Sequence, residues 1–474
     1  MVDRRGFLKW SAAALAGAPL VMAGQAAGAE QRNGQDLGPR VQPRGDGRVI
    51  TPNGRSVQGE VVDGVRVFHL VAEPIEHSVV EGLNLQMWGF NGITPGPTLE
   101  ATVGETVRIY VTNELPAPTS IHWHGIEVPN GMDGVNGMTQ EAIEPGKTYV
   151  YEFDLPRPGT FMYHPHTDEM TQIGLGMMGA IIVHPEQPEP IDRDYVIHLA
   201  EFSVRSGRGR PDTTEMVDFD VLTMNSTIFP ATEPLVAQLG ELVRIRLINM
   251  SQMSHHPIHL HGHTFDITAT EGGRIPSAGQ WPETTVLVPT GAVREIEFVA
   301  DNPGDWALHC HMLHHVMNQM GHPTPSAVGV DDDALQEVVH PVIPEFHAMG
   351  GTGMAGMVDH APRFEETAYP SVEMPEVDPH EHHDHDDHDD HDDPHDHNDV
   401  EMEHEMELPQ NSVAMKVTEG PMGPIEMGGM FTVVMVRDEL PEDIEQLDWY
   451  DHPEGTVARE ATGEELRRDG IETE

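Results

Sequence analysis

The sequence predicts an all-β protein built from two β-sandwich domains. Three observations support this: short runs of alternating apolar and polar residues, turns rich in Pro, Gly and Asn, and a repeat of the whole pattern. Runs such as GVRVFHLVAE and KTYVYEFDL have the two-residue period of half-buried strands, and long helical periodicity is missing from the sequence. Antiparallel sandwiches combine these features.

The chain has 474 residues, enough for two to four domains, and a net charge of -53 from 79 acidic and 26 basic residues. Such a surface repels phosphates, so nucleic acids and anionic membranes are not expected as partners. Only three of the basic residues are lysines. The acid excess suits a surface kept soluble at high salt, where ions screen like charges; a GC-rich genome would also favour Arg over Lys.

The first 29 residues have the features of an export signal. A basic region with paired arginines, MVDRRGFLKW, precedes an apolar run from Ala12 to Met22, and residues 27–29 offer a small-residue cleavage site. The pattern resembles a twin-arginine signal, which exports folded proteins, and predicts a periplasmic, cell-surface or extracellular location. The alternative is an uncleaved membrane anchor, although the run is shorter than the ~20 residues of a span. No other transmembrane segment is expected.

The next residues, 30–61, are polar and rich in Gly and Pro, so they are expected to be flexible. A duplicated pattern follows. ETVRIYVTN, HWH and RPGTFMYHPH in the first copy are echoed by ELVRIRLIN, HLH and NPGDWALHCH in the second. One β-domain is therefore expected at residues 62–186 and its copy at residues 193–335, joined by the linker EQPEPID.

Residues 336–410 have low sequence complexity. A Met- and Gly-rich stretch precedes residues 380–407, which are nearly all His, Asp and Glu. This composition cannot bury a core and predicts disorder. A weak metal trap and a solvated acidic spacer are both open as its role. Residues 411–474 form a C-terminal extension in which GGMFTVVMVRDELP has strand character and could pack on the body.

Histidines separated by one residue recur at matching places in the two copies. Residues i and i+2 of a strand point to the same face, so each pair delivers two imidazoles to one place. Imidazole suits copper, zinc and iron, and eight converging rings are more than one metal ion can take. The sequence therefore predicts a centre with several metal ions, served by the pairs His122/His124, His164/His166, His259/His261 and His309/His311.

The single cysteine, Cys310, stands between His309 and His311 and so faces away from that centre. There it could meet His256, His315 and Met320, which would form the two-His, one-Cys site with a weak axial Met that defines blue copper. The thiolate would then be joined through the chain to ligands of the other centre. A lone cysteine also excludes intramolecular disulfides.

HWHG, HPH, HPIHLHGH and HCHMLHHVMNQM resemble, in order and spacing, the four copper signatures of the multicopper oxidases, over residues 62–330. The resemblance implies two cupredoxin-like Greek-key domains and four coppers per chain. It assigns type 1 copper to His256, Cys310, His315 and Met320, type 2 to His122 and His259, and the type 3 pair to His124, His164, His166, His261, His309 and His311. It implies one-electron oxidation of a reductant at type 1 and reduction of dioxygen to water at the other three coppers.

The spacing of the signatures distinguishes this chain from the three-domain members of the family. Only 89 residues separate His166 from His256, so the chain resembles the two-domain, small-laccase type. That type implies a homotrimer in which neighbouring subunits share each three-copper cluster. In the first copy Pro165, Met170 and Leu175 stand where type 1 ligands would be, so only the second copy is expected to hold type 1 copper.

Asp133 occupies a position that resembles the family's acid beside the three-copper cluster, where it would relay protons. An ordinary turn Asp is the alternative, and Asp168 and Glu169 are further candidates. Several other residues are expected to pack or to donate hydrogen bonds instead of binding metal: His255, His263, His314 and His322. The methionines near HPH are expected to fill the core: Met162, Met170, Met177 and Met178. A thioether site for Cu(I) fits better in the Gly-rich context of Met349, Met354 and Met357.

The expected function is an exported oxidase acting on a metal ion, Cu(I) or Mn(II), with a role in copper tolerance. A laccase-type phenol oxidase stays open, as does a copper-binding or storage protein without turnover. Copper nitrite reductase is a more distant alternative. It resembles the chain less, because its thiol lies in the first domain and its second centre is one copper with three histidines.

Overall fold

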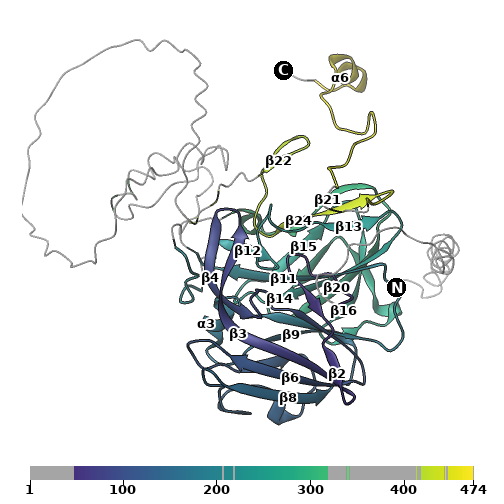
Figure 1. Cartoon of the computed structure of the whole chain (residues 1–474). Coiled ribbons are helices and arrows are strands. Elements are labelled where there is room, and N and C mark those ends of the chain that lie inside the picture. Colours follow the sequence, from purple (N-terminus) through teal and green to yellow (C-terminus); the bar gives the residue numbers. More distant parts are fainter. Residues whose placement is uncertain are drawn as a thin grey trace, which may run out of the picture.

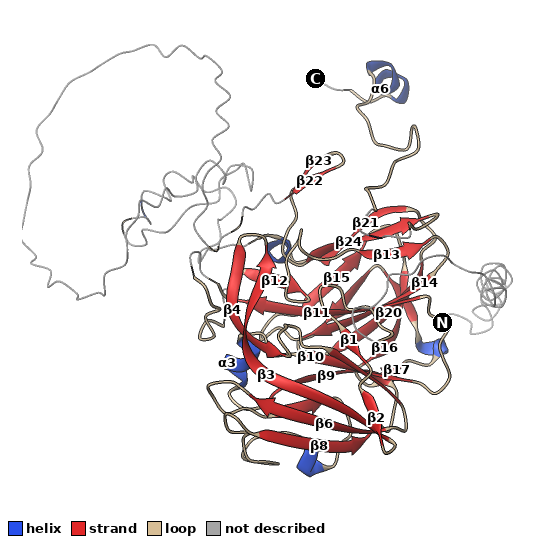
Figure 2. Ribbon diagram, viewed as in Figure 1, coloured by secondary structure: helices blue, strands red, loops and turns tan. Residues whose placement is uncertain are grey.

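The computed structural model describes residues 47–204, 208–216, 219–318, 418–441 and 447–472, with isolated positions 338, 341, 411, 413 and 444. Figures 1 and 2 show two layered β-domains lying against each other. The predicted export signal, Met320 and nearly all of residues 336–410 lie outside the described residues.

The first domain packs two sheets around one core. One sheet has, in order, β1 (Ser56–Val57), β5 (Thr98–Thr102), β10 (Gly179–His184), β9 (Gly159–Pro165) and β7 (Ile121–His124). The other has β2 (Glu60–Val62), β3 (Val65–Val80), β6 (Thr106–Asn113) and β8 (Thr148–Asp154), with β4 (Leu83–Phe90) paired to β3.

The second domain is built in the same way. One sheet has β12 (Val221–Met224), β11 (Arg193–Phe202), β14 (Leu242–Asn249), β20 (Val293–Val299), β16 (Phe265–Thr270) and β17 (Gly273–Arg274), with β18 (Trp281–Glu283) paired to β16. The other has β13 (Leu235–Gln238), β24 (Phe431–Arg437), β21 (Gly304–Cys310), β15 (His256–Leu260) and β19 (Thr285–Val288).

The strand β24 takes the place in the second domain that β10 has in the first. Each runs antiparallel to the strand that carries the second histidine pair, and each has a parallel neighbour on its other side. β10 follows β9 after a short loop, whereas the whole low-complexity segment lies between β21 and β24. The predicted boundary at residue 335 therefore leaves out a strand that belongs to the middle of this sheet.

The equivalent strands β6 and β14 differ in what covers their outer face. On β6, Arg108 forms an ion pair with Glu152 on the exposed side of the sheet. On β14, Arg244 and Arg246 are both buried. Thr160 of the first domain accepts a hydrogen bond from Arg246 at 2.6 Å, because this face of β14 packs against that domain.

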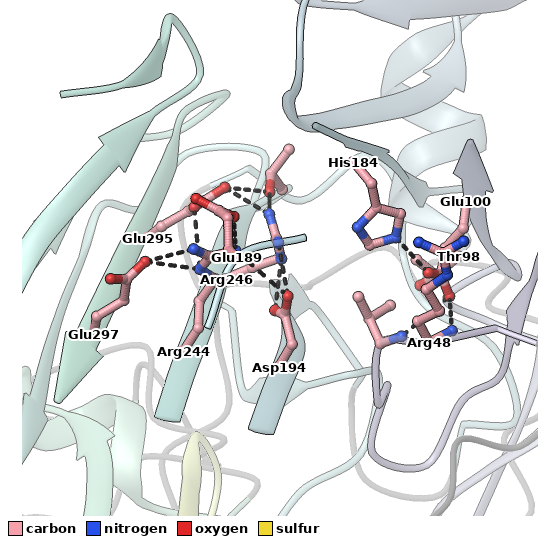
Figure 3. A network of polar contacts seen from close by, with 12 residues as sticks. Arg48, Thr98, Glu100, His184, Glu189, Asp194, Arg244, Arg246, Glu295 and Glu297 are labelled. Carbon is pink, nitrogen blue, oxygen red and sulfur yellow. Dashed lines mark hydrogen bonds and ion pairs between the residues drawn. The ribbon is translucent and has the colours of Figure 1, made fainter. Parts of the chain in front are cut away.

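Carboxylates neutralise these buried arginines, as Figure 3 shows. Arg246 donates to Asp194 at 2.7 Å and to Glu295 at 2.7 Å, and Arg244 donates to Glu297 at 2.7 Å. Burial alone would lower the pKa of Arg246, but these carboxylates raise it above its ordinary value. These ion pairs lie within the second domain, and Thr160 links them to the first domain through hydrogen bonds with Arg246 and Glu295.

An apolar core shared by both domains adjoins this network. It combines residues of the first domain, such as Leu85, Met162 and Ile182, with residues of the second, such as Phe202 and Ile248. Burial of apolar surface stabilises such an interface by about 25 cal/mol per Å². The two domains therefore form one packed body.

Residues 47–57 also connect the domains, although the sequence predicted a flexible segment there. Ile50 pairs with Tyr195 of the second domain, and Ser56 pairs with Thr98 of the first. The carboxylate of Glu100 accepts hydrogen bonds from the backbone of Arg48 and Val49 (Figure 3). Part of the predicted flexible segment is thus ordered and pairs with both domains across their interface.

The remaining elements are short. They are α3 (Glu169–Gly174), α6 (Gly463–Asp469), the hairpin of β22 (Thr418–Gly420) and β23 (Gly423–Ile425), and the 3-10 turns η1 (Asn130–Met132), η2 (Ser277–Gly279) and η3 (Leu313–Val316). Within the described residues, no helix has both the length and the apolar character needed to cross a membrane.

Candidate metal centres

The first domain gathers four histidines at one edge of a sheet. β7 carries His122 and His124, and β9 places His164 directly opposite His122. His166 follows the end of β9. The ring centroid of His122 lies 5.6 Å from that of His124, 5.4 Å from that of His164 and 5.6 Å from that of His166. We call these four residues the first quartet.

The second domain repeats this arrangement. β15 and β21 are antiparallel neighbours, and His259 lies opposite His309. The ring centroid of His259 lies 4.8 Å from that of His261, 5.7 Å from that of His309 and 5.5 Å from that of His311. We call these four residues the second quartet. His259 and His261 line an open hollow of about 320 Å³ on the surface.

Strand alternation explains why the rings converge. The residue between the two histidines of a pair points to the opposite face and enters the core, as Trp123, Leu260 and Cys310 do. The direction of the two histidine rings is thus fixed by the core packing of the residue between them.

Backbone carbonyls orient four of the eight rings. Nδ1 of His122 donates to the carbonyl of Asp133 at 2.8 Å, and Nδ1 of His259 donates to the carbonyl of Thr284 at 2.7 Å. His164 and His309 each donate Nδ1–H to the carbonyl of the following residue, at 2.9 and 2.8 Å. A carbonyl can only accept, so the lone pair of each ring is on Nε2, the atom that would bind a metal ion. In His164 and His309 this atom faces another ring, Nδ1 of His124 at 3.3 Å and Nε2 of His261 at 3.1 Å.

The sharp turn after Asp133 needs a glycine. Gly134 has φ +85°, and a Cβ at this position would lie 1.8 Å from the carbonyl oxygen of Ile121. No side chain can be accommodated at that distance. Gly134 thereby lets the Asp133 carbonyl reach His122.

Burial keeps several of these rings neutral. It lowers the pKa of His164 to about 3 and lowers the pKa values of His124 and His309, and the neighbouring histidines contribute in the same direction. A neutral imidazole is the form that binds metal. At neutral pH these rings therefore need not lose a proton before they bind a metal ion.

A three-residue site lies on the other side of β21. Sγ of Cys310 is 3.8 Å from Nδ1 of His256 and 3.3 Å from Nδ1 of His315, and the two Nδ1 atoms are 3.1 Å apart. All three side chains are buried. His256 begins β15, Cys310 ends β21, and His315 lies in η3. Two imidazoles and one thiol fit the trigonal donor set of blue copper.

Burial of this site disfavours charge on all three of its groups. Burial raises the pKa of the Cys310 thiol to about 12 and lowers the pKa values of His256 and His315 to about 3. The site thus holds neutral groups, and a metal ion that binds must displace the thiol proton.

Sequence reasoning missed Ser251. Its buried hydroxyl lies 2.6 Å from Nε2 of His256 and leaves Nδ1 of that ring facing Cys310. A polar residue five positions before a predicted ligand is a weak signal, because many loop serines have no such role.

The predicted acids lie beside the first quartet in different ways. Oδ1 of Asp133 is 3.4 Å from Nδ1 of His122, and Oε1 of Glu169 is 3.0 Å from Nε2 of His166. Asp168 is exposed at the start of α3 and has a left-handed backbone, with φ 45°. Two carboxylates therefore reach the quartet. Met320, the predicted axial ligand, lies outside the described residues.

The two quartets do not touch each other within one chain. Every ring contact among the eight histidines joins members of the same quartet, and no hydrogen bond between described residues links one quartet to the other. Each domain thus presents half of the predicted eight-histidine centre.

In the first domain, a hydrogen-bonded pair stands where the second has its thiol site. Thr119, at the position equivalent to His256, donates to Gln172 at 2.6 Å, and Gln172 donates to the carbonyl of Pro118 at 2.9 Å. Pro165 occupies the position of Cys310. These residues offer neither a thiol nor an imidazole.

The flanking histidines have the contacts expected of supporting residues. His263 is buried against Phe298 and Trp306, and Nδ1 of His255 accepts the backbone N–H of Thr290 at 3.0 Å. The ring of His314 lies 4.2 Å from that of His315. His322 lies outside the described residues.

Three of the four methionines near HPH fill cores, as predicted: Met162, Met177 and Met178 are buried. The prediction is wrong for Met170, which is 51% exposed on α3. Met349, Met354 and Met357 lie outside the described residues.

Comparisons with known proteins agree with this geometry. Two family models, both described as multicopper oxidase, match residues 72–188 and 201–328, together about half of the chain. The crystal structure of a blue copper oxidase from Nitrosomonas europaea is 32% identical with a TM-score of 0.50, over 54% of this chain and 82% of that one. The predicted all-β fold with two cupredoxin-like domains is confirmed.

Two curated relatives have different names. A probable nitrite reductase-hydroxylamine oxidoreductase fusion protein of Kuenenia stuttgartiensis is 29% identical over 274 residues, 54% of this chain and 31% of that protein. Copper resistance protein A of Escherichia coli is 42% identical over 126 residues, 26% of this chain and 20% of that protein. The chain thus matches less than a third of the length of either. The two domain matches and the histidine signatures together show that the chain belongs to the multicopper oxidase family, in its two-domain form.

Proposed function

We propose that this protein is an exported multicopper oxidase that couples the one-electron oxidation of a reductant to the four-electron reduction of dioxygen to water. One observation carries the proposal. Cys310 reaches a buried two-histidine site with its side chain, while its neighbours His309 and His311 belong to a quartet on the opposite face. One short peptide therefore joins two different centres.

The donor set fits four copper ions per chain. His256, Cys310, His315 and Met320 would hold type 1 copper, and His122 and His259 would hold type 2. The type 3 pair would be held by His124, His164, His166, His261, His309 and His311. Bound copper would supply the single-electron steps that oxygen reduction requires, since the side chains themselves have no suitable redox chemistry.

The chain offers a short connection between the two centres. The Cys310 sulfur is bonded through Cβ and Cα to its own carbonyl, and that carbonyl accepts the Nδ1–H of His309 at 2.8 Å. The same hydrogen bond fixes the ring of His309, so one contact both orients a ligand and shortens the path from the sulfur.

Asp133 is our proposed proton donor to the oxygen-reducing centre. Its carboxylate lies 3.4 Å from Nδ1 of His122 and is partly accessible to solvent, as a proton relay requires. Glu169 reaches His166 and is the alternative. Asp133→Asn and Glu169→Gln should separate them: the variant that lowers kcat while the copper content stays unchanged identifies the relay.

A homotrimer would complete the oxygen-reducing centre. The separation of the quartets within one chain supports this, because each needs a partner surface with four more imidazoles. A ring in which the first domain of each subunit meets the second domain of the next would supply it at every interface. A sedimenting monomer with full copper content and activity would exclude this assembly.

We favour Cu(I), or another metal ion such as Mn(II), as the reductant. The support is the Met- and His-rich sequence after residue 336 and the likeness to copper resistance protein A. Steady-state rates on anaerobically prepared Cu(I) and on a dimethoxyphenol would test this choice. A large preference for the phenol would make the protein a laccase.

Two other functions predict different measurements. The name of the Kuenenia stuttgartiensis fusion protein keeps nitrite reduction open, but the thiol here lies in the second copy and eight imidazoles are available. A storage protein would bind copper without turnover. Four coppers per chain, an intense blue absorption, a type 2 EPR signal and oxygen uptake would establish the oxidase. Nitrite-dependent turnover, or no oxygen uptake with any donor, would contradict it.

The proposed location is outside the cytoplasm, on the strength of the twin-arginine pattern in residues 1–29. Replacing Arg4 and Arg5 by lysines should keep the protein in the cytoplasm, which fractionation followed by immunoblotting would detect. Unchanged export would contradict the route.

A further inference from the structure

Residues 428–430, directly before the C-terminal strand β24, contact the loop that carries the proposed type 1 ligands. The backbone N–H of Cys310 donates to the carbonyl of Met430 at 3.1 Å, and the N–H of Met430 donates to the carbonyl of His315 at 2.9 Å. The N–H of Gly428 donates to the carbonyl of Val316 at 2.9 Å. One short segment thus holds both the thiol and the second imidazole in place.

Two glycines allow this close approach. A Cβ on Gly428 would lie 2.1 Å from Oδ1 of Asn318, and a Cβ on Gly429 would lie 2.5 Å from the carbonyl oxygen of His315. Gly429 also has φ +54°, a conformation that favours glycine. The sequence Gly428-Gly429 is therefore matched to the backbone of the ligand loop.

Met430 lies next to Cys310 on the inner face of the sheet. The register of β21 and β24 ends at the pair His309–Phe431, and Met430 directly precedes β24 and accepts the backbone N–H of Cys310 at 3.1 Å. Both side chains are fully buried in the same core cluster. The backbone hydrogen bond and the shared cluster place the thioether on the same side of the sheet as the cysteine sulfur.

The alternation of β24 provides a matched comparison on the same strand. Phe431, Val433 and Met435 belong to a separate cluster on the outer face. Met435 is therefore a second buried methionine, five residues further on, whose side chain points away from Cys310.

We propose that Met430 is a positioning residue of the type 1 site and that its thioether covers the Cys310 sulfur. β24 holds the ligand loop through its backbone, and Met430 keeps the surroundings of the sulfur apolar. The hydrophobicity around this sulfur is one of the properties that tune a blue copper site. The inference rests on the proposed function, and it assigns to the C-terminal segment a role that does not depend on the identity of the reductant.

Met430→Gln tests the role with a side chain of similar size. A buried amide makes the surroundings of the sulfur polar, so the type 1 reduction potential and the blue absorption band should both shift, with copper content unchanged. Met430→Leu should stay close to the wild type. Met435→Gln, on the other face, should lower Tm without altering either spectrum or potential. Equal spectra and potentials in Met430→Gln and the wild type would overturn the proposal.

A cleavage experiment tests the segment without changing any residue at the site. A protease site placed in the low-complexity sequence between residues 349 and 410 would cut the full-length protein between β21 and β24. The C-terminal fragment should co-elute with the body and the blue absorption should persist, and both should be lost together in urea. Release of the fragment with the absorption unchanged would overturn the proposal, even if Met430→Gln fails to fold.

These outcomes are distinct from a failure of the proposed function. If the copper-loaded wild type has no type 1 spectrum, the oxidase proposal fails. If that spectrum is present but does not change in Met430→Gln or after loss of β24, only the role of Met430 and β24 is contradicted.

Discussion

The two domains share one strand plan but differ in the loop after their second histidine pair. In the first domain this loop contains α3, and the pair Thr119–Gln172 fills the space below it. In the second domain the equivalent region brings together His256, Cys310 and His315. Strand positions supply the quartet imidazoles in both copies, whereas the thiol site needs Cys310 and His256 on strands together with His315 in the loop.

The copies also differ in how their final strand is supplied. β10 follows its loop directly, but β24 comes from the far side of the low-complexity segment. The strand order survives this insertion, because β24 makes the same parallel and antiparallel pairings as β10. The two copies therefore share the same strand pairing, although the chain reaches the final strand by a much longer connection in the second copy.

Replacing Cys310 by Ser removes the residue that most distinguishes the two domains. We expect complete loss of the blue absorption and of oxygen uptake with any donor. In the proposed scheme the Cys310 sulfur both binds type 1 copper and connects it to the oxygen-reducing centre. The type 2 EPR signal should persist, since both quartets are intact. Absorption, EPR and oxygen electrode measurements provide the test, and retained colour with retained turnover would contradict the whole scheme.

Combining a defect in each quartet tests whether neighbouring subunits share the site. The variant with His122 and His124 both changed to Ala and the variant with His259 and His261 both changed to Ala should each be inactive. In trimers that contain both variants they should recover about a third of wild-type activity, because one of the three interfaces in each mixed ring pairs two intact halves. Purification with two different tags isolates the mixed trimers. If they stay inactive, the cluster is not shared in this way.

Changing Arg246 to Met tests the contrast between β14 and β6. Asp194 and Glu295 would lose a buried partner, so the free energy of unfolding should fall by about 3–5 kcal/mol. Arg108→Met is the matched variant on the exposed face of the first copy and should change stability little. Urea unfolding followed by tryptophan fluorescence measures both, and equal losses would show that the domain interface is not important to stability.

His198 is a buried histidine on β11 at the place where the first copy has Val71. Burial lowers its pKa from 6.5 to about 4, so the unfolded state takes up the proton first. Above pH 6.5 the ring is neutral in both the folded and the unfolded state, so its contribution to stability is complete. As the pH falls towards 4, only the unfolded state binds the proton, and the free energy of unfolding falls by up to about 3 kcal/mol. In copper-free protein, His198→Val should flatten the pH dependence of unfolding over this range. An unchanged slope would exclude His198 as its source.

Thr119→Ala should have the smallest effect. It leaves Oε1 of the buried Gln172 without the hydroxyl donor, which costs about 1–2 kcal/mol of stability. Because this position in the first copy offers neither a thiol nor an imidazole, the type 1 spectrum should not change. Thermal unfolding and absorption spectra of the copper-loaded protein test both parts, and a shifted spectrum would show that the first domain acts on the thiol site.

The sequence was sufficient for features that depend on local periodicity. The H-x-H pairs predicted convergent imidazoles, and the strands deliver them because the two-residue period holds along β7 and β15. The opposite orientation of Cys310 follows from the same rule. The duplication was also visible, because the VRI strands and the histidine pairs recur in order.

Features that depend on distant partners could not be predicted. Arg244 and Arg246 alternate in the sequence as surface residues would, and only the packing of the first domain buries them. Residues 47–57 lack a clear strand pattern, yet Glu100 and Tyr195 give them backbone partners. The place of β24 was hidden by the length of the insertion, although its apolar run was recognised as a strand.

The late position of β24 in the chain has a consequence for biosynthesis. While the ribosome is still translating the low-complexity segment, β21 and β13 have no strand between them, and both expose unpaired edges to the cytosol. The second domain can close only after nearly the entire polypeptide has emerged. An export route that waits for complete synthesis and folding would suit such a chain, whereas threading it across a membrane during translation would separate the strand from its sheet.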